Sequence, residues 1–174
     1  MKNFEIKSFL SIYSLLPSLT KAIDKLVLTR ALCPYPQEDV VLHAEKITRL
    51  SQYKVSLINL KLLTDKTLVK MPEDASTLII CRFIDEMSVD DCIFLSGMSR
   101  RSYFRKLGSA INTFKKIFFR ILDSSSPAIQ KAVKDEFWND VFYSISVFNS
   151  RGKEIKTCKE SLCAVILNRM RKFV

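Results

Sequence analysis

Glycine, histidine and tryptophan are scarce in this sequence, and each scarcity excludes a class of protein. The 174 residues include only 3 Gly, 1 His and 1 Trp. A β-sandwich needs many turn residues, so the shortage of glycine argues against an all-β fold. The single histidine, His43, excludes histidine-based metal clusters and leaves little basis for a Ser-His-Asp triad. We therefore expect no metal site, no catalytic residues and no enzymatic activity.

Long apolar runs and regularly spaced cysteines are also missing. The longest apolar stretches, 78–81 and 141–148, are far too short to span a bilayer. The 5 cysteines are odd in number and form no C-x-x-C pair, which disfavours a zinc site or a disulfide framework. Neither common nucleotide-binding loop is present, so we expect no cofactor. The first apolar run, 9–16, is broken by serines, so we expect no signal peptide and a reducing cytoplasmic location.

Positive charge is abundant and concentrated in one part of the chain. Lys and Arg number 28 against 18 Asp and Glu, a net charge of +10. Residues 87–122 hold 7 basic and 2 acidic residues, so half of the net charge lies in about a fifth of the sequence. No acidic residue occurs between Asp91 and Asp123. This one-signed segment indicates an anionic partner, with nucleic acid or an acidic membrane surface as the first candidates.

Helical periodicity runs along the whole chain and predicts an all-α fold. We expect helices at 8–16, 20–32, 39–50, 55–69, 75–86, 89–95, 100–121, 128–148 and 157–173. Prolines and serines mark connectors at 33–36 and 123–127. The predicted organisation is an N-terminal helical region at 1–72, a DNA-binding domain at 73–122 and a C-terminal helical extension at 123–174.

The middle segment, 75–118, has the order helix, helix, tight turn, long helix, which is typical of a helix-turn-helix without a wing. Ser88 precedes two acidic residues and is expected to cap the short helix. The turn is Ser96-Gly97-Met98, and Ser99 is expected to cap the long helix. In such a motif the first turn of the second helix enters the major groove of DNA.

The long helix divides into two faces when its residues are placed at 100° steps. The apolar face, expected to pack on the preceding helices, contains Tyr103, Phe104, Leu107, Ala110, Ile111, Phe114, Ile117 and Phe118. The other residues carry groups that bind phosphates and base edges. We expect DNA contacts from Ser99, Arg100, Arg101, Ser102, Arg105, Lys106, Ser109, Asn112, Lys115 and Lys116. The expected base contacts are Arg101, Ser102, Arg105 and Lys106; the expected phosphate contacts are Arg100, Lys115 and Lys116.

The residues of this segment resemble a known pattern in transcription proteins. The matching elements are Arg82-Phe83-Ile84, Met87-Ser88-Val89-Asp90-Asp91, the Ser99–Arg105 stretch and Gly108-Ser109-Ala110-Ile111. Residues 55–118 resemble region 4 of sigma-70-type factors, and more closely the small phage-type regulators of the ArpU and related families. The resemblance implies binding of double-stranded promoter DNA and contact with core RNA polymerase.

Two functions follow from the sequence as alternatives. The first is a sigma-factor-like transcription regulator that binds promoter DNA and recruits or directs RNA polymerase; a compact sigma factor and a sigma-like activator both remain open. The second is a non-enzymatic helical adaptor or polymerase accessory protein whose basic face binds an acidic protein partner. Neither function requires a small-molecule substrate. A membrane-binding role is confined to the basic last helix, 157–173.

Overall fold

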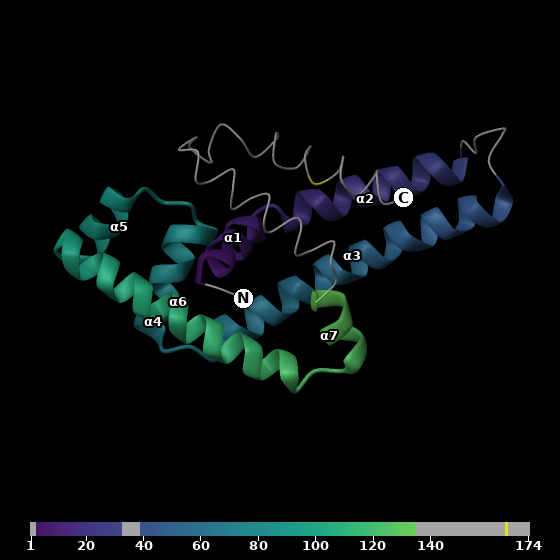
Figure 1. The fold of residues 1–174 in the computed structure, drawn as a ribbon. Coiled ribbons are helices and arrows are strands. Elements are labelled where there is room, and N and C mark those ends of the chain that lie inside the picture. The colour runs from purple at the N-terminus through teal and green to yellow at the C-terminus, as the bar shows by residue number, and fades with distance from the viewer. Residues whose placement is uncertain (1–2, 33–38, 135–165, 167–174) are drawn as a thin grey trace.

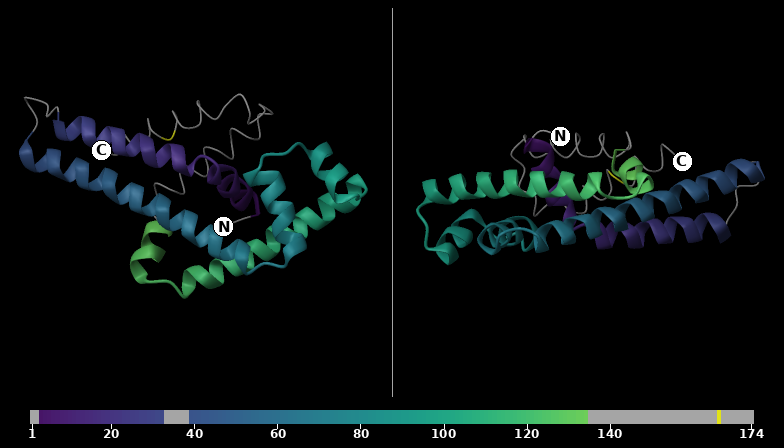
Figure 2. Two further views of the ribbon diagram at one scale, coloured as in Figure 1. Left: turned by 180° about the vertical axis from the view of Figure 1, so that it is seen from behind. Right: turned by 90° about the horizontal axis from the view of Figure 1, so that it is seen from below.

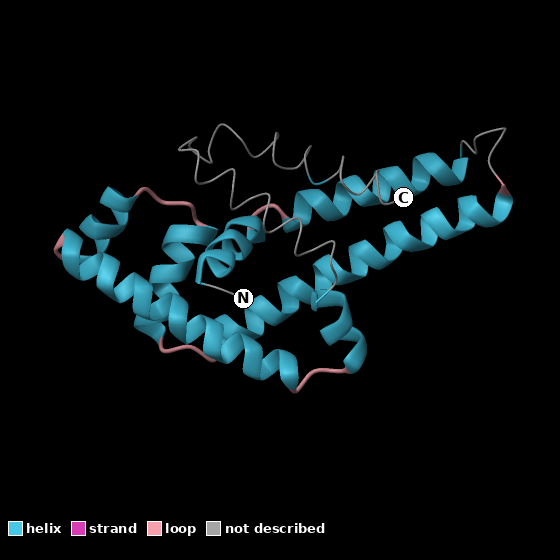
Figure 3. Ribbon diagram, viewed as in Figure 1, coloured by secondary structure: helices cyan, strands magenta, loops and turns pink. Residues whose placement is uncertain are grey.

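The structure is a computed structural model that describes residues 3–32, 39–134 and 166, and all regular structure in these ranges is helical (Figure 3). This confirms the predicted all-α class. The elements are α1 (Asn3–Tyr13), α2 (Leu16–Leu32), α3 (Val40–Val69), α4 (Glu73–Ile79), the π-helical turn η1 (Ile80–Ile84), α5 (Val89–Ser96), α6 (Arg100–Asp123) and α7 (Pro127–Lys134). The predicted helices beyond residue 134 lie outside the described residues.

Helices α2 and α3 pack side by side as a long hairpin that projects beyond the other helices (Figure 1). The first turn of α2 contains Pro17, where a missing amide proton costs no intrahelical hydrogen bond. None of the helices in the described ranges is long and apolar enough to cross a membrane.

Helix α3 is continuous over 30 residues, so the prediction of separate helices at 39–50 and 55–69 is wrong. The polar stretch between those ranges does not interrupt the helix because Leu50 and Tyr53 are buried on its inner side. The hydroxyl of Ser51 donates to the carbonyl of Ile47, so this polar side chain is satisfied within the helix. Tertiary burial therefore overrides the local polar signal.

The core is built mainly where α6 packs against α1, α3 and α4 (Figures 1 and 2). The rings of Phe9 and Phe118 lie 5.2 Å apart, and Phe114 stacks on Phe118 at 5.7 Å between centroids. Such aromatic contacts add to the large apolar area that each ring buries. Buried residues from 1–72, 73–122 and 123–174 belong to one cluster, which includes Val133 and Ile166.

Two hydrogen bonds attach the end of α1 to distant parts of the chain. The hydroxyl of Tyr13 donates to Asp65 of α3, and burial together with this carboxylate raises the pKa of Tyr13 to about 12. Ser14 donates to the carboxylate of Glu86 at 2.6 Å. The first bond attaches α1 to the base of the α2–α3 hairpin, and the second connects the link between α1 and α2 to the segment that leads into α5.

The helical stretch predicted at 75–86 begins and ends two residues earlier, at Glu73 and Ile84, and is less regular than expected. It is α-helical only to Ile79 and continues as a π-helical turn to Ile84. A π-turn accommodates an extra residue and changes the direction of the chain. The chain then leaves the helix, and Arg82 donates to the carbonyl of Met87 at 2.6 Å, which anchors the loop before α5.

Candidate nucleic-acid interface

Helices α5 and α6 meet at a sharp corner formed by Gly97, Met98 and Ser99. Gly97 has φ +62°, a left-handed conformation that glycine adopts without the penalty of a side chain. The hydroxyl of Ser99 accepts a hydrogen bond from the amide of Ser102 at 3.3 Å. Ser88 caps α5 in the same way, accepting from the amide of Asp91 at 3.1 Å. The structure thus confirms both predicted helix starts.

The inner face of α6 is buried along most of the helix. Its buried side chains include Tyr103, Leu107, Ala110, Ile111, Phe114 and Phe118. Burial raises the pKa values of Tyr103 and Cys81, with the Cys92 thiol contributing to both shifts. These groups therefore stay neutral at physiological pH and add no negative charge beneath the basic helix.

Phe104 does not belong to the buried face as predicted, because 48% of its surface is exposed. Its ring packs edge-on against Tyr103 with 5.5 Å between centroids. The helices that cover Tyr103 and Leu107 leave the neighbouring row of α6 open. Phe104 therefore lies beside Arg101 and Gly108 at the exposed end of the helix.

From Arg101 to Arg120 the outer face of α6 is exposed and carries positive charge only, and the exposed Asp123 follows it at the end of the helix. Five predicted site residues lie within about 80° around the helix axis, namely Arg101, Arg105, Ser109, Asn112 and Lys116. Arg120 is also exposed and extends this row by one turn. The sequence analysis missed Arg120, although its spacing of four residues from Lys116 was the available signal. We name this surface, Arg101 to Arg120 on the outer side of α6, the basic face.

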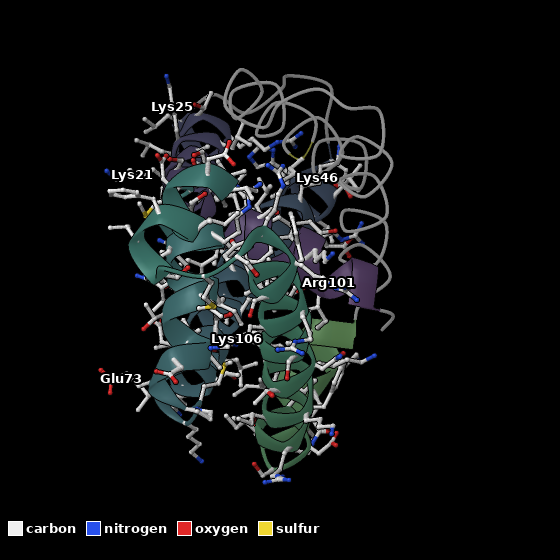
Figure 4. The ribbon with its side chains drawn as sticks, turned by 90° about the vertical axis from the view of Figure 1, so that its left-hand side faces the viewer. Lys21, Lys25, Lys46, Glu73, Arg101 and Lys106 are labelled. Carbon is white, nitrogen blue, oxygen red and sulfur yellow. The ribbon has the colours of Figure 1, made fainter. Side chains whose placement is uncertain are left out.

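The remaining predicted residues lie around the edges of the basic face. Lys106 is exposed about 140° from Arg101, and the two side chains extend to opposite sides of α6 (Figure 4). Arg100 forms an exposed ion pair with Asp90 at 3.3 Å, which joins the starts of α5 and α6. Lys115 is half-buried. These cations flank the basic face without sharing its orientation.

The two predicted serines at the start of α6 act in helix capping. The hydroxyl of Ser99 accepts a hydrogen bond from the amide of Ser102, and the Ser102 side chain is half-buried. A capping oxygen keeps a second lone pair, so Ser99 can still accept from a bound donor. The cap accounts for the Ser99 side chain, whereas Ser102 contributes only its backbone amide to it.

An exposed apolar pair on α5 was not anticipated from the sequence. Phe94 is 85% exposed and Leu95 is 65% exposed. Helix α5 buries only Cys92, because it contacts the rest of the molecule mainly through η1. Apolar residues occur on every side of this eight-residue helix, and a single packed side leaves some of them in solvent.

The function of the chain has to be inferred from the α5–α6 corner itself. No protein-family model, curated protein or solved structure matches this sequence. The corner combines a left-handed turn, two capped helices and a one-signed exposed face over a buried aromatic one. These features are the basis of the proposal below.

Proposed function

We propose that this protein is a sigma-factor-like transcription regulator that binds promoter DNA through a helix-turn-helix formed by α5 and α6. One observation carries the proposal. The basic face presents cations and hydrogen-bonding groups without an acidic residue, directly opposite the buried face that holds α6 in place. Phosphates attract such a surface at long range, and a helix of this kind fits the major groove.

Each group on the basic face suits a different part of the DNA. Arg101 and Arg105, in the first turns of α6, suit bidentate hydrogen bonds to guanine O6 and N7. Asn112 suits the N6 and N7 edge of adenine. Lys116 and Arg120 lie further along the helix and suit phosphates, which fix register and supply affinity.

Two other features of the corner fit close approach to a duplex. Gly108 lies on the exposed side of α6, and a Cβ added there would meet no atom within 4 Å. The helix backbone is therefore uncovered at this point. Phe104 is exposed beside Arg101, where an aromatic ring can contact a thymine methyl group.

The polymerase part of the proposal rests on the resemblance of residues 55–118 to sigma region 4. In this reading, the N-terminal region, 1–72, is available to contact the polymerase core. It supplies α1, α2 and α3, of which the α2–α3 hairpin projects furthest from α6 (Figure 1). A protein that directs polymerase needs such a second surface, separate from the one that binds DNA.

A second candidate is the helical adaptor that binds an acidic protein. The exposed Phe94 and Leu95 favour it, because apolar side chains gain more from a protein surface than from phosphates. In this alternative the basic face pairs with carboxylates of the partner, and Phe94 fills a pocket on it.

Sequence-specific binding tests the DNA proposal directly. With a duplex selected from a random library, Arg105→Ala should lower affinity by about 10- to 100-fold, or ~1–3 kcal/mol, because a base contact is lost. The same variant should bind random duplexes nearly as well as the wild type does. Lys116→Ala should weaken all duplexes about equally. Fluorescence anisotropy measures both, and unchanged affinities in both variants contradict DNA binding through α6.

Transcription with purified components separates the remaining readings. The sigma-like proposal expects copurification with core RNA polymerase and a change in promoter-dependent RNA synthesis when the chain is added. RNA synthesis by core polymerase plus this chain alone identifies a sigma factor, whereas dependence on another sigma factor identifies an activator. Loss of a partner protein in Phe94→Ala, with no DNA binding by the wild type, supports the adaptor.

A further inference from the structure

Helix α3 has two apolar sides, and within the part of the chain that the structure describes only one of them is covered. The inner side is buried against the rest of the protein through residues such as Leu50, Leu57 and Leu60. The other side faces solvent along the same helix. We name it the outer seam, and it consists of Val41, Ala44, Thr48, Ser51, Val55, Ile58 and Leu62.

The outer seam has the spacing of a coiled coil. Its members are separated alternately by three and four residues, which is the a/d pattern of a heptad repeat. Every member is exposed, and none is charged. The seam extends over about 32 Å at 1.5 Å per residue, enough for three heptads. An amphipathic globular helix needs one apolar stripe for its own core, so this second stripe requires another explanation.

The two hydroxyl groups in the seam are already hydrogen-bonded within α3. Thr48 donates to the carbonyl of Ala44 at 2.9 Å, and Ser51 donates to the carbonyl of Ile47 at 3.0 Å. Their donors therefore need no water and no partner. Both side chains can enter a dry interface without the cost of an unsatisfied polar group.

The order of side-chain sizes along the seam indicates which partner packs against it. The larger residues Val55, Ile58 and Leu62 lie toward one end of the seam. The smaller residues Ala44, Thr48 and Ser51 lie toward the other end, with Val41 beyond them. When two identical helices run antiparallel, each a position faces a d position of the other copy. The facing pairs are then Leu62 with Ala44, Ile58 with Thr48 and Val55 with Ser51. Large residues thus face small ones in every central layer, as close packing requires.

We propose that the outer seam is a homodimer interface in which a second copy of this chain packs its α3 antiparallel to the first. The two-fold axis passes between Ser51 and Val55, and each contact occurs twice, as in any isologous dimer. A parallel arrangement instead places Leu62 against Leu62 and Ala44 against Ala44. The distance between the two helix axes would then differ from one end of the interface to the other. The proposal is independent of DNA binding by α6.

The cation nearest to the middle of the seam permits this arrangement. Lys54, which flanks its centre, is bound to Asp24 of α2 at 2.6 Å. Its ammonium group is therefore partly neutralised within its own copy. A nucleic acid or an acidic protein would need cations in the seam itself, and the seven seam residues contain none.

The first test measures the mass of the full chain by sedimentation equilibrium. The wild type should be a dimer at micromolar concentration. Ile58→Glu should raise the dimer dissociation constant by about 100-fold or more, because two carboxylates become buried. Circular dichroism should show unchanged helix content, since Ile58 is exposed within one copy. Leu28→Glu, at an exposed leucine outside the seam, should remain dimeric.

The second test addresses orientation. In an antiparallel pair, Ala44→Leu and Leu62→Ala each weaken the dimer by about 10-fold or more, and the double variant regains most of the loss because the sizes are exchanged. In a parallel pair, Ala44→Leu strengthens the dimer and the double variant shows no recovery. A monomeric wild type, including one whose seam binds a different protein, overturns the proposal. A dimer that persists in Ile58→Glu also overturns it, as does a dimer that Leu28→Glu weakens as much as Ile58→Glu does. The antiparallel orientation is contradicted if Ala44→Leu strengthens the dimer and the double variant shows no recovery.

Discussion

The distal half of the α2–α3 hairpin and the helices around α6 use apolar residues in opposite ways. Around α6, aromatic rings such as Phe114 and Phe118 are almost fully buried. In the hairpin, the ranges 24–32 and 39–49 contain no buried residue. Nine of the twelve exposed large hydrophobic residues in the described part of the chain lie on α2 and α3. The body around α6 is therefore stabilised from within, whereas the hairpin displays apolar surface.

The two regions also differ in how they display charge. The basic face of α6 carries no acidic residue, and its cations have a common orientation. On the hairpin, Lys54 pairs with Asp24, and the acidic Asp65 lies between Lys61 and Lys66 of α3. One-signed charge indicates binding to a polyanion, while an uncharged exposed stripe indicates packing against protein. The contrast suggests that the two regions bind different partners.

Removing a buried aromatic ring from the helices around α6, the body of the protein, should produce the largest loss of stability. Phe114→Ala is expected to lower the free energy of unfolding by ~3–5 kcal/mol, because it creates a cavity among packed rings. Leu32→Ala, at a leucine that is 71% exposed, should change it by less than about 0.5 kcal/mol. Urea unfolding followed by circular dichroism measures both. Equal losses would show that the hairpin is packed as tightly as the body.

Two glycines of the body should respond in opposite directions to alanine. Gly97→Ala should cost ~1–2 kcal/mol, because the left-handed backbone at φ +62° is unfavourable for any residue with a Cβ. Gly108→Ala should stabilise by ~0.5–1 kcal/mol, because it removes helix-interior flexibility and the added methyl meets no atom within 4 Å. Thermal and urea unfolding of the two variants provide the measurement. A loss of stability in both variants argues that Gly108 is packed against something.

The hydrogen bond between Tyr13 and Asp65, where the hairpin joins the helices around α6, should make a smaller contribution to the free energy of unfolding, and this contribution should depend on pH. The pKa of Tyr13 is raised from 10.0 to about 12, chiefly by burial and then by Asp65, so the folded state favours the protonated phenol. This contribution is complete below pH 10 and is lost as the pH rises toward 12. Tyr13→Phe should unfold with a weaker pH dependence over this interval. An unchanged dependence contradicts a role for this phenol at the junction.

Much of the α5–α6 corner could be predicted from sequence because its signals are local. Ser88 and Ser99 each precede a helix with a typical capping pattern, and Gly97 marks the turn between them. The buried face of α6 also follows from helical spacing. Phe104 was misplaced because spacing alone does not show which neighbours cover the first turn of a helix.

The hairpin was harder to predict because its structure depends on distant contacts. The polar residues around Ser51 suggested a break in α3, but burial of Tyr53 and Leu50 keeps the helix continuous. The outer seam becomes visible only after the break is removed, since its heptad pattern runs across it. The π-turn at 80–84 likewise has no distinctive residue pattern.

The salt dependence of DNA binding tests the central claim most directly. Binding to phosphates releases counterions, so the logarithm of the association constant of the wild type should fall steeply with the logarithm of salt concentration. The double variant Lys116→Ala/Arg120→Ala, which removes two expected phosphate contacts of the basic face, should have a shallower slope. The matched control Lys21→Ala/Lys25→Ala removes the same charge from two exposed residues of α2, far from Arg101 (Figure 4), and should keep the wild-type slope. A flat wild-type slope, or equal reductions in both double variants, would contradict DNA binding through the basic face of α6.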